Sequence, residues 1–181
     1  MIVGHFGMAY GVRALDKRDP DACVSLLWLL AAAIAPDILD GVFALGKYCN
    51  PDGMMSHSLP AVAILAVVFG VAAFLHTRRA TTALLVAGMV VLHLPPDFLT
   101  GRKLLWPGGP VVGLYIYRWP WLDLLVEVPV IVGGWWMLRR TPFTPRLAVS
   151  GLALAAMLTV QCALDLQSQL RGPQPARVCT R

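Results

Sequence analysis

The chain of 181 residues is 57% hydrophobic and only 14% charged, and its mean hydropathy is +0.67. Because a soluble domain carries about 25% charged residues, this composition excludes a soluble globular domain and indicates a surface that faces lipid. The net charge of +5 does not indicate a nucleic-acid partner. The basic residues lie in short loops between apolar segments, as they do in membrane proteins.

Six apolar segments follow one another along the chain, and each is expected to form a helix. They cover residues 2–15, 22–45, 58–75, 80–94, 121–138 and 147–166. A spanning helix needs about 20 apolar residues, a length that the first and fourth segments do not reach. Pro95 and Pro96 are expected to end the fourth helix, because proline cannot continue a helical ladder.

These segments predict an all-α integral membrane bundle of five to six transmembrane helices. Residues 1–166 are expected to form one transmembrane domain, followed by a polar tail over residues 167–181. The stretch 100–120 is rich in glycine, proline, tryptophan and tyrosine. We expect it to be an interfacial loop with its aromatic rings at headgroup depth, where residues 106–121 would serve as a lid or membrane anchor.

Eight ionisable residues lie in or at the ends of the apolar segments: His5, Asp37, Asp40, His57, His93, Asp97, Asp123 and Glu127. An ionisable group in a membrane span costs about 2.5–3.5 kcal/mol on insertion scales, so each is by default a hypothesis for a functional site. A single buried histidine is more often a packing residue. Asp123 could instead favour a helix N-terminus, and Ser56 and Ser58 could cap the helix near Leu59.

The expected topology brings these eight residues to one side of the membrane. If the turn 16–21 lies on side A, the loops 76–79 and 139–146 lie there too, and all eight residues fall on side B. His93 and Asp97 are spaced i, i+4, which puts both on one helix face. Carboxylates and imidazoles at one depth are a ligand set for zinc, manganese or iron, and a bound divalent cation would relieve their repulsion.

The order of motifs resembles a known family. The motifs are Gly4-His5, Ala35-Pro36-Asp37-x-x-Asp40, Ser56-His57-Ser58, His93-x-x-x-Asp97 and Leu105-Trp106-Pro107-Gly108-Gly109-Pro110. They resemble the bacterial and archaeal membrane-bound predicted metal-dependent hydrolases, and more distantly the zinc-dependent phospholipase C and nuclease P1 group. The resemblance implies metal binding, with zinc expected first, by His5, Asp37, Asp40, His57, His93 and Asp97. Glu127 would be a further acid.

The leading hypothesis is a membrane-embedded hydrolase that acts on a phosphoester of a lipid-like substrate. In it, Asp40 or Glu127 acts as the catalytic base or orients a ligand, and Arg102, Lys103 and Arg118 bind the substrate phosphate. The alternatives are an accessory subunit of a larger membrane complex and a small cation or proton transporter. Side A loops carry more basic residues than side B loops, which favours side A as cytoplasmic. We expect the chain to lie in a bacterial inner membrane, where the site would then face the periplasm or exterior.

Overall fold

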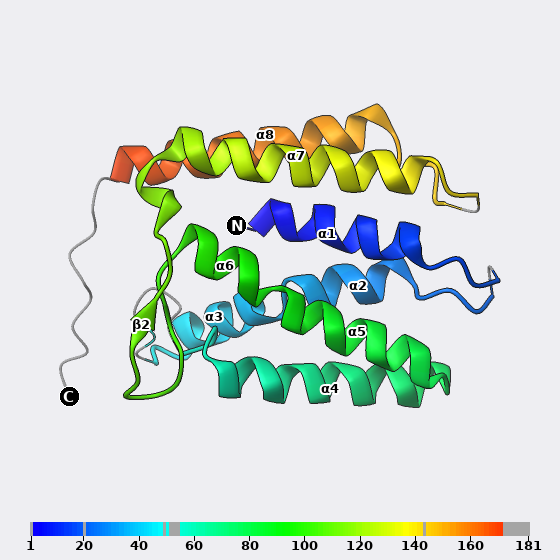
Figure 1. Cartoon of the computed structure of the whole chain (residues 1–181), viewed down its shortest axis with the longest axis horizontal. Helices are drawn as coiled ribbons and strands as arrows, with labels where there is room; N and C mark the ends of the chain where they lie inside the picture. Colours follow the sequence, from blue (N-terminus) through cyan, green and yellow to red (C-terminus); the bar gives the residue numbers. More distant parts are fainter. Residues whose placement is uncertain (1, 20, 49, 51–54, 143, 172–181) are drawn as a thin grey trace.

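Helices make up most of the described chain, which comprises residues 2–19, 21–48, 50, 55–142 and 144–171 of a computed structural model. In chain order the elements are α1 (Ile2–Leu15), α2 (Leu26–Ala33), α3 (Ala35–Leu45), α4 (Leu59–Thr77), α5 (Ala80–Leu92), α6 (Leu94–Thr100), β1 (Lys103–Leu104), β2 (Val111–Val112), η2 (Ile116–Arg118), α7 (Pro120–Arg139) and α8 (Gly151–Arg171). The helices lie side by side along one axis (Figure 1).

Three of these stretches have the length and apolar composition of a membrane span. They are α4 with 19 residues, α7 with 20 and the continuous stretch α5–α6 with 21. At 1.5 Å per residue each is about 30 Å long, which matches the hydrocarbon core of a bilayer. The pair α2–α3 is a fourth candidate if it counts as one span bent by 53°. The predicted helical membrane bundle is therefore confirmed with three to four candidate spans, while five to six spans stay a prediction.

Two predicted helices are broken where the sequence places prolines. The segment 22–45 was expected to be one helix, but it divides at Ile34, and Pro36 stands in the first turn of α3. The fourth predicted helix ends at Leu92, shortly before Pro95 and Pro96, as expected, but the chain continues at once into α6, whose first turn contains both prolines. Proline is tolerated there, since the N–H groups of a first turn have no acceptor within the helix.

The stretch 101–119 is more ordered than the loop that the sequence predicted. It contains an antiparallel pair in which Lys103 is opposite Val112 and Leu104 is opposite Val111. The backbone N–H of Leu59 donates to Leu105, and that of Leu114 donates to Phe98, over 2.9 Å in each case. These bonds hold this hairpin loop against α4 and α6. At the other end of the chain, α8 continues into the predicted tail as far as Arg171, and residues 172–181 lie outside the described part.

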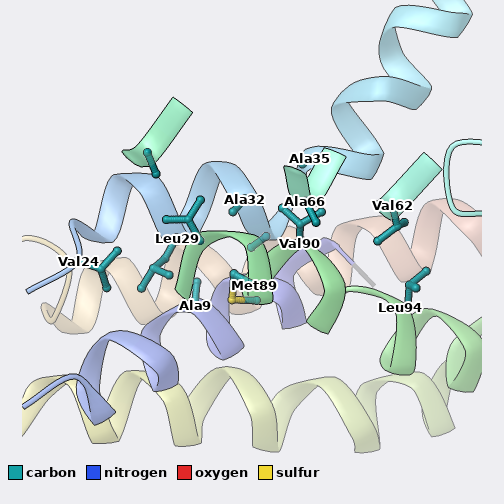
Figure 2. Packing of buried hydrophobic residues seen from close by; sticks show 13 residues of the cluster. Ala9, Val24, Leu29, Ala32, Ala35, Val62, Ala66, Met89, Val90 and Leu94 are labelled. Atoms are coloured by element: carbon teal, nitrogen blue, oxygen red, sulfur yellow. The ribbon is translucent and has the colours of Figure 1, made fainter. Parts of the chain in front are cut away.

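Small side chains allow the helices to pack closely. Figure 2 shows the main core, in which Ala32 of α2, Ala66 of α4 and Val90 of α5 lie close together. Helix α1 packs along α7 through two glycines: a Cβ atom added to Gly134 would lie 1.9 Å from the carbonyl oxygen of Gly7. The backbones of α1 and α7 therefore approach each other more closely than any side chain would permit.

The turns with the basic residues lie at one end of the bundle. The turns α1–α2, α4–α5 and α7–α8 all lie at the right of Figure 1. There the guanidinium group of Arg79 donates to the carbonyl oxygen of Asp21, and that of Arg18 donates to Thr81 Oγ1. The start of α1, helix α3 and the hairpin loop lie toward the other end. This is the arrangement that the alternating topology predicted.

Candidate metal centre

Two buried imidazoles share one carboxylate oxygen where α5 passes into α6. His93 follows the last residue of α5, Asp97 lies in the first turn of α6, and His57 lies shortly before α4. The Nε2 atom of His57 is 3.0 Å from Oδ2 of Asp97, and the Nε2 atom of His93 is 3.2 Å from the same oxygen. All three side chains are buried. The i, i+4 spacing thus brings His93 and Asp97 into contact despite the two prolines between them.

The orientation of His93 is fixed from the opposite side of its ring. Its Nδ1 atom donates to the carbonyl oxygen of Ala33 over 2.7 Å. The Nε2 atom of a neutral His93 then carries a lone pair and faces a carboxylate oxygen. In the described part of the chain, this Nε2 atom is buried without a hydrogen-bond partner. A cation between the two acceptor atoms would stabilise this arrangement.

His5 brings a third imidazole from the start of α1. Its ring stacks on that of His93, with centroids 3.7 Å apart and an angle of 11° between the planes. Its Nε2 atom lies 3.2 Å from the carbonyl oxygen of His93 and 3.5 Å from Oδ1 of Asp97. Nδ1 of His5 and Oδ2 of Asp37 are buried and have no hydrogen-bond partner among the described residues. Both atoms therefore have the capacity to bind a ligand.

Asp40 contacts the back of His57. Its Oδ2 atom lies 3.7 Å from Nδ1 of His57, and that nitrogen is 2.9 Å from the hydroxyl of Ser56. Oδ1 of Asp40 accepts hydrogen bonds from Ser56 and, over 2.6 Å, from Asn50. The Nε2 atom of His57 faces Asp37 at 3.5 Å. Asp40 and Ser56 thus orient a ring whose other nitrogen points into the cluster.

The structure brings together all six candidate metal ligands, which we call the histidine–aspartate cluster: His5, Asp37, Asp40, His57, His93 and Asp97. They form three overlapping groups of three, and within each group the potential ligand atoms lie within 4.8 Å of one another. Five of these six residues lie near the end of a helix or between helices, and Asp40 lies in the middle of α3. The set of imidazoles and carboxylates fits zinc, manganese or iron by its donor chemistry.

Lys103 is the one predicted phosphate-binding residue that the described structure places at this cluster. Its ammonium group lies 3.5 Å from Oδ2 of Asp97, and its side chain is only 13% exposed. Arg102 lies over the ring of Tyr115 at 5.4 Å, and Arg118 lies over that of Trp119 at 5.2 Å. Both arginines thus stack on aromatic rings of the hairpin loop, and among the described residues neither forms an ion pair with the cluster.

Glu127 belongs to a second polar cluster, formed by Asp123 and Glu127 of α7 and Gln161 and Asp165 of α8. Oε2 of Glu127 accepts the backbone N–H of Gly4 over 3.2 Å, and Nε2 of Gln161 donates to Oδ1 of Asp165 over 3.0 Å. All four side chains are buried. Among the described residues, none of the three potential metal-binding groups includes Glu127. The i, i+4 spacing of Gln161 and Asp165 in an apolar helix was the available sequence signal for this second cluster.

The hydrogen bonds that support the ligands were not predicted from the sequence. Ser58 takes the N-cap position of α4, but its side chain makes no capping bond and instead donates to the carbonyl oxygen of Met55. Ser56 bonds Asp40 and His57 rather than a helix end. The sequence did not single out Asn50 as a residue that supports Asp40, because asparagine is common in turns. The carbonyl of Ala33 could not be foreseen without the break between α2 and α3.

A bundle of apolar helices with buried imidazoles and carboxylates toward one end defines a polytopic membrane protein with a buried polar cluster. The profile of the YdjM inner membrane protein family matches residues 1–167, and the chain belongs to this family. The predicted membrane location is thereby confirmed. No curated protein and no solved structure matches the chain. Metal binding and hydrolase activity stay predictions.

Proposed function

We propose that this protein is a membrane-embedded, metal-dependent hydrolase that acts on a phosphoester of a lipid-like substrate. The observation that carries the proposal is the convergence of His57 and His93 on Asp97. Three donor groups face one another at 3.0 and 3.2 Å in a buried site. Burying such groups in an apolar bundle is costly, and a function that needs a cation accounts for that cost.

The ligands of the divalent metal would be His57, His93, Asp37 and Asp97, with His5 and Asp40 beside them. Zinc is the first candidate, and manganese and iron suit the same donors. When bound, such an ion lowers the pKa of a water molecule toward neutrality and polarises the phosphoryl oxygen. The protein's own contribution is to fix the donors: Ala33 holds the ring of His93, and Ser56 holds that of His57.

The proton-accepting role falls to Asp40 rather than to Glu127. The carboxylate of Asp40 is about a third exposed, with a side-chain exposure of 33%, so it can exchange a proton with its surroundings. It also contacts His57 directly and through Ser56. Glu127 accepts a hydrogen bond from Gly4 and belongs to the second polar cluster. We therefore assign Glu127 no step in the reaction.

Lys103 would hold the phosphate of the substrate. Its ammonium group neutralises Asp97 at 3.5 Å, and an ammonium group within reach of a metal site is a common ligand for phosphate oxygens. Arg102 and Arg118, on the same loop, would contact the headgroup region. Because the basic turns lie at the other end of the bundle, the positive-inside rule orients the site toward the periplasm or exterior.

A transporter would need ionisable groups over the full depth of the membrane, whereas the six candidate ligands gather in one place.

The test of the hydrolase uses the full chain purified in detergent and loaded separately with zinc, manganese or iron(II). Phosphate release from phosphatidic acid and hydrolysis of soluble bis(4-nitrophenyl) phosphate are measured. We expect turnover that EDTA abolishes and that Asp97→Asn lacks. No turnover with any of the three metals, or equal turnover in Asp97→Asn, would reject the proposal.

A further inference from the structure

An apolar groove lies between α1, α2, α3 and α8, and two of its lining residues, Phe6 and Ile38, directly follow His5 and Asp37 in the sequence. It has a volume of about 440 Å³. Its walls include Phe6, Tyr10, Leu30, Ile34, Ile38 and Met157. The volume is within the range of about 300–1,000 Å³ that small-molecule sites occupy.

The packing of α1 explains why the groove exists. Gly7 and Gly134 draw α1 against α7, and α8 also packs on α7. The side chains of Phe6 and Tyr10 on α1 then line a space that α2, α3 and α8 enclose only in part. Ala31 and Ala153 on two of its walls are small, which keeps the groove wide.

The two ends of the groove differ. At one end, Phe6 directly follows His5, and Ile34 and Ile38 lie on either side of Asp37 along the chain. At the other end, Tyr10, Leu30 and Met157 pack in a hydrophobic cluster with Trp135 and Leu138. One end of the groove is thus lined by residues that adjoin two candidate metal ligands in the sequence, and the other end is lined by residues of a hydrophobic cluster.

We propose that this groove binds an acyl chain of the phospholipid whose phosphoester is presented to the metal centre. The inference rests on the proposed function and specifies its substrate class. An apolar groove does not retain water, and in a bilayer a hydrocarbon chain is the available apolar occupant. From Leu27 to Ile38 the lining follows α2 and α3 for roughly 16 Å, which suits an extended chain.

The test is photolabelling of the full chain in dodecylmaltoside micelles that contain phosphatidic acid with a diazirine in its palmitoyl chain. We expect label on the peptides that carry Leu30 and Met157. Filling the groove with Ala153→Trp should reduce this label about tenfold. The matched control is Ala155→Trp, because Ala155 is exposed and lies on the opposite face of the same helix from Ala153 and Met157. A smaller change on the other wall, Ala31→Leu, should cause the same loss of label. This variant tests whether the groove binds the acyl chain if Ala153→Trp does not fold.

Hydrolysis of the soluble bis(4-nitrophenyl) phosphate separates this inference from the proposed function. If the groove holds the chain, Ala31→Leu should retain activity on the soluble ester and lose it on palmitoyl phosphatidic acid. Label that is equal in Ala31→Leu, Ala155→Trp and wild type would overturn the groove as the binding site of the acyl chain, even if the metal-dependent activity stands. An inactive wild type that still carries label on Leu30 and Met157 would overturn the hydrolase and leave lipid binding in the groove supported.

Discussion

The ring of His93 is held by the carbonyl oxygen of Ala33, which lies 2.7 Å from its Nδ1 atom. Ala33 is the last residue of α2, and at the end of a helix the last carbonyl oxygens lack N–H donors from a following helical turn. The break between α2 and α3 therefore provides a hydrogen-bond acceptor for His93, which lies between α5 and α6. A hydrogen bond from a ligand's second nitrogen to a carbonyl is a common way to fix a metal-binding histidine.

The first prediction concerns metal content. We expect stoichiometric divalent metal in the detergent-purified wild type, and its loss in His57→Ala and Asp97→Ala, because the first removes an imidazole and the second the carboxylate that it faces. Elemental analysis measures this directly. The matched control is His76→Ala: His76 lies at the opposite end of α4, where it accepts a hydrogen bond from the indole of Trp28 over 3.0 Å. Equal metal in wild type, His57→Ala and Asp97→Ala would rule out the metal centre.

The second prediction concerns the support of His57. Ser56→Ala removes the hydroxyl that lies between His57 and Asp40. Loss of such a supporting bond typically weakens metal binding about 10–100-fold, and we expect that range here. Competition with a chelating dye measures the affinity. Ser58→Ala is the control, because that hydroxyl bonds only the nearby carbonyl of Met55 in the described structure; equal affinities in the two variants would contradict the role of Ser56.

The third prediction concerns the contact between α1 and α7. Gly134→Ala places a Cβ atom 1.9 Å from the carbonyl oxygen of Gly7, so the helices must separate. Overpacking of this kind costs about 1–3 kcal/mol or more, which thermal unfolding in detergent would show as a lower melting temperature. Gly133→Ala on the same helix meets no atom within 4 Å and should melt like wild type. If both variants melt alike, the close approach is not important for stability.

The fourth prediction concerns pH. The hydrogen bond from Arg18 holds the pKa of Asp16 at about 2, below its ordinary value of 3.8. Since the folded state favours the ionised carboxylate, its stabilising effect is full above the ordinary pKa and is lost as the pH falls through about 4 to 2. We expect Asp16→Asn to melt a few degrees below wild type at neutral pH, and this difference to shrink in that acid range.

Asp19→Asn provides the control for this pH effect. Asp19 is an exposed carboxylate in the same turn, so the substitution removes the same charge without breaking the pair with Arg18. Asp16 also accepts the backbone N–H of Val24 over 2.8 Å, which ties the end of α1 to the start of α2. A difference between Asp16→Asn and wild type that stays constant down to pH 2 would contradict the role of the ionised carboxylate.

Several features of the fold followed from the sequence because they depend on local composition. The helix Ile2–Leu15 has the predicted limits, and α4 and α7 begin and end within two residues of their predicted segments. Length and hydropathy determine these elements, since a spanning segment must satisfy its own backbone hydrogen bonds. The prolines were harder to interpret. A proline either ends a helix or begins one, and which occurs depends on the path of the preceding chain.

The candidate site could likewise be predicted from the sequence only in part. The alternation of helices placed His5, His57, His93 and Asp97 on one side of the membrane, because antiparallel neighbours return to the same side with each pair of crossings. The sequence also placed Glu127 there. It could not show that Glu127 faces Gly4 in the second polar cluster, because depth in the membrane does not fix the direction of a side chain.

The sequence by itself determined that the chain lies in a membrane, where most helices run, and which ionisable residues share an end of the bundle. These follow from hydropathy and chain order, which are local properties. Only the tertiary structure decided that one oxygen of Asp97 faces both His57 and His93, that Lys103 reaches it, and that Glu127 does not. Those contacts depend on helix rotation and on the close approach at Gly7 and Gly134, which are set by side-chain packing between distant segments.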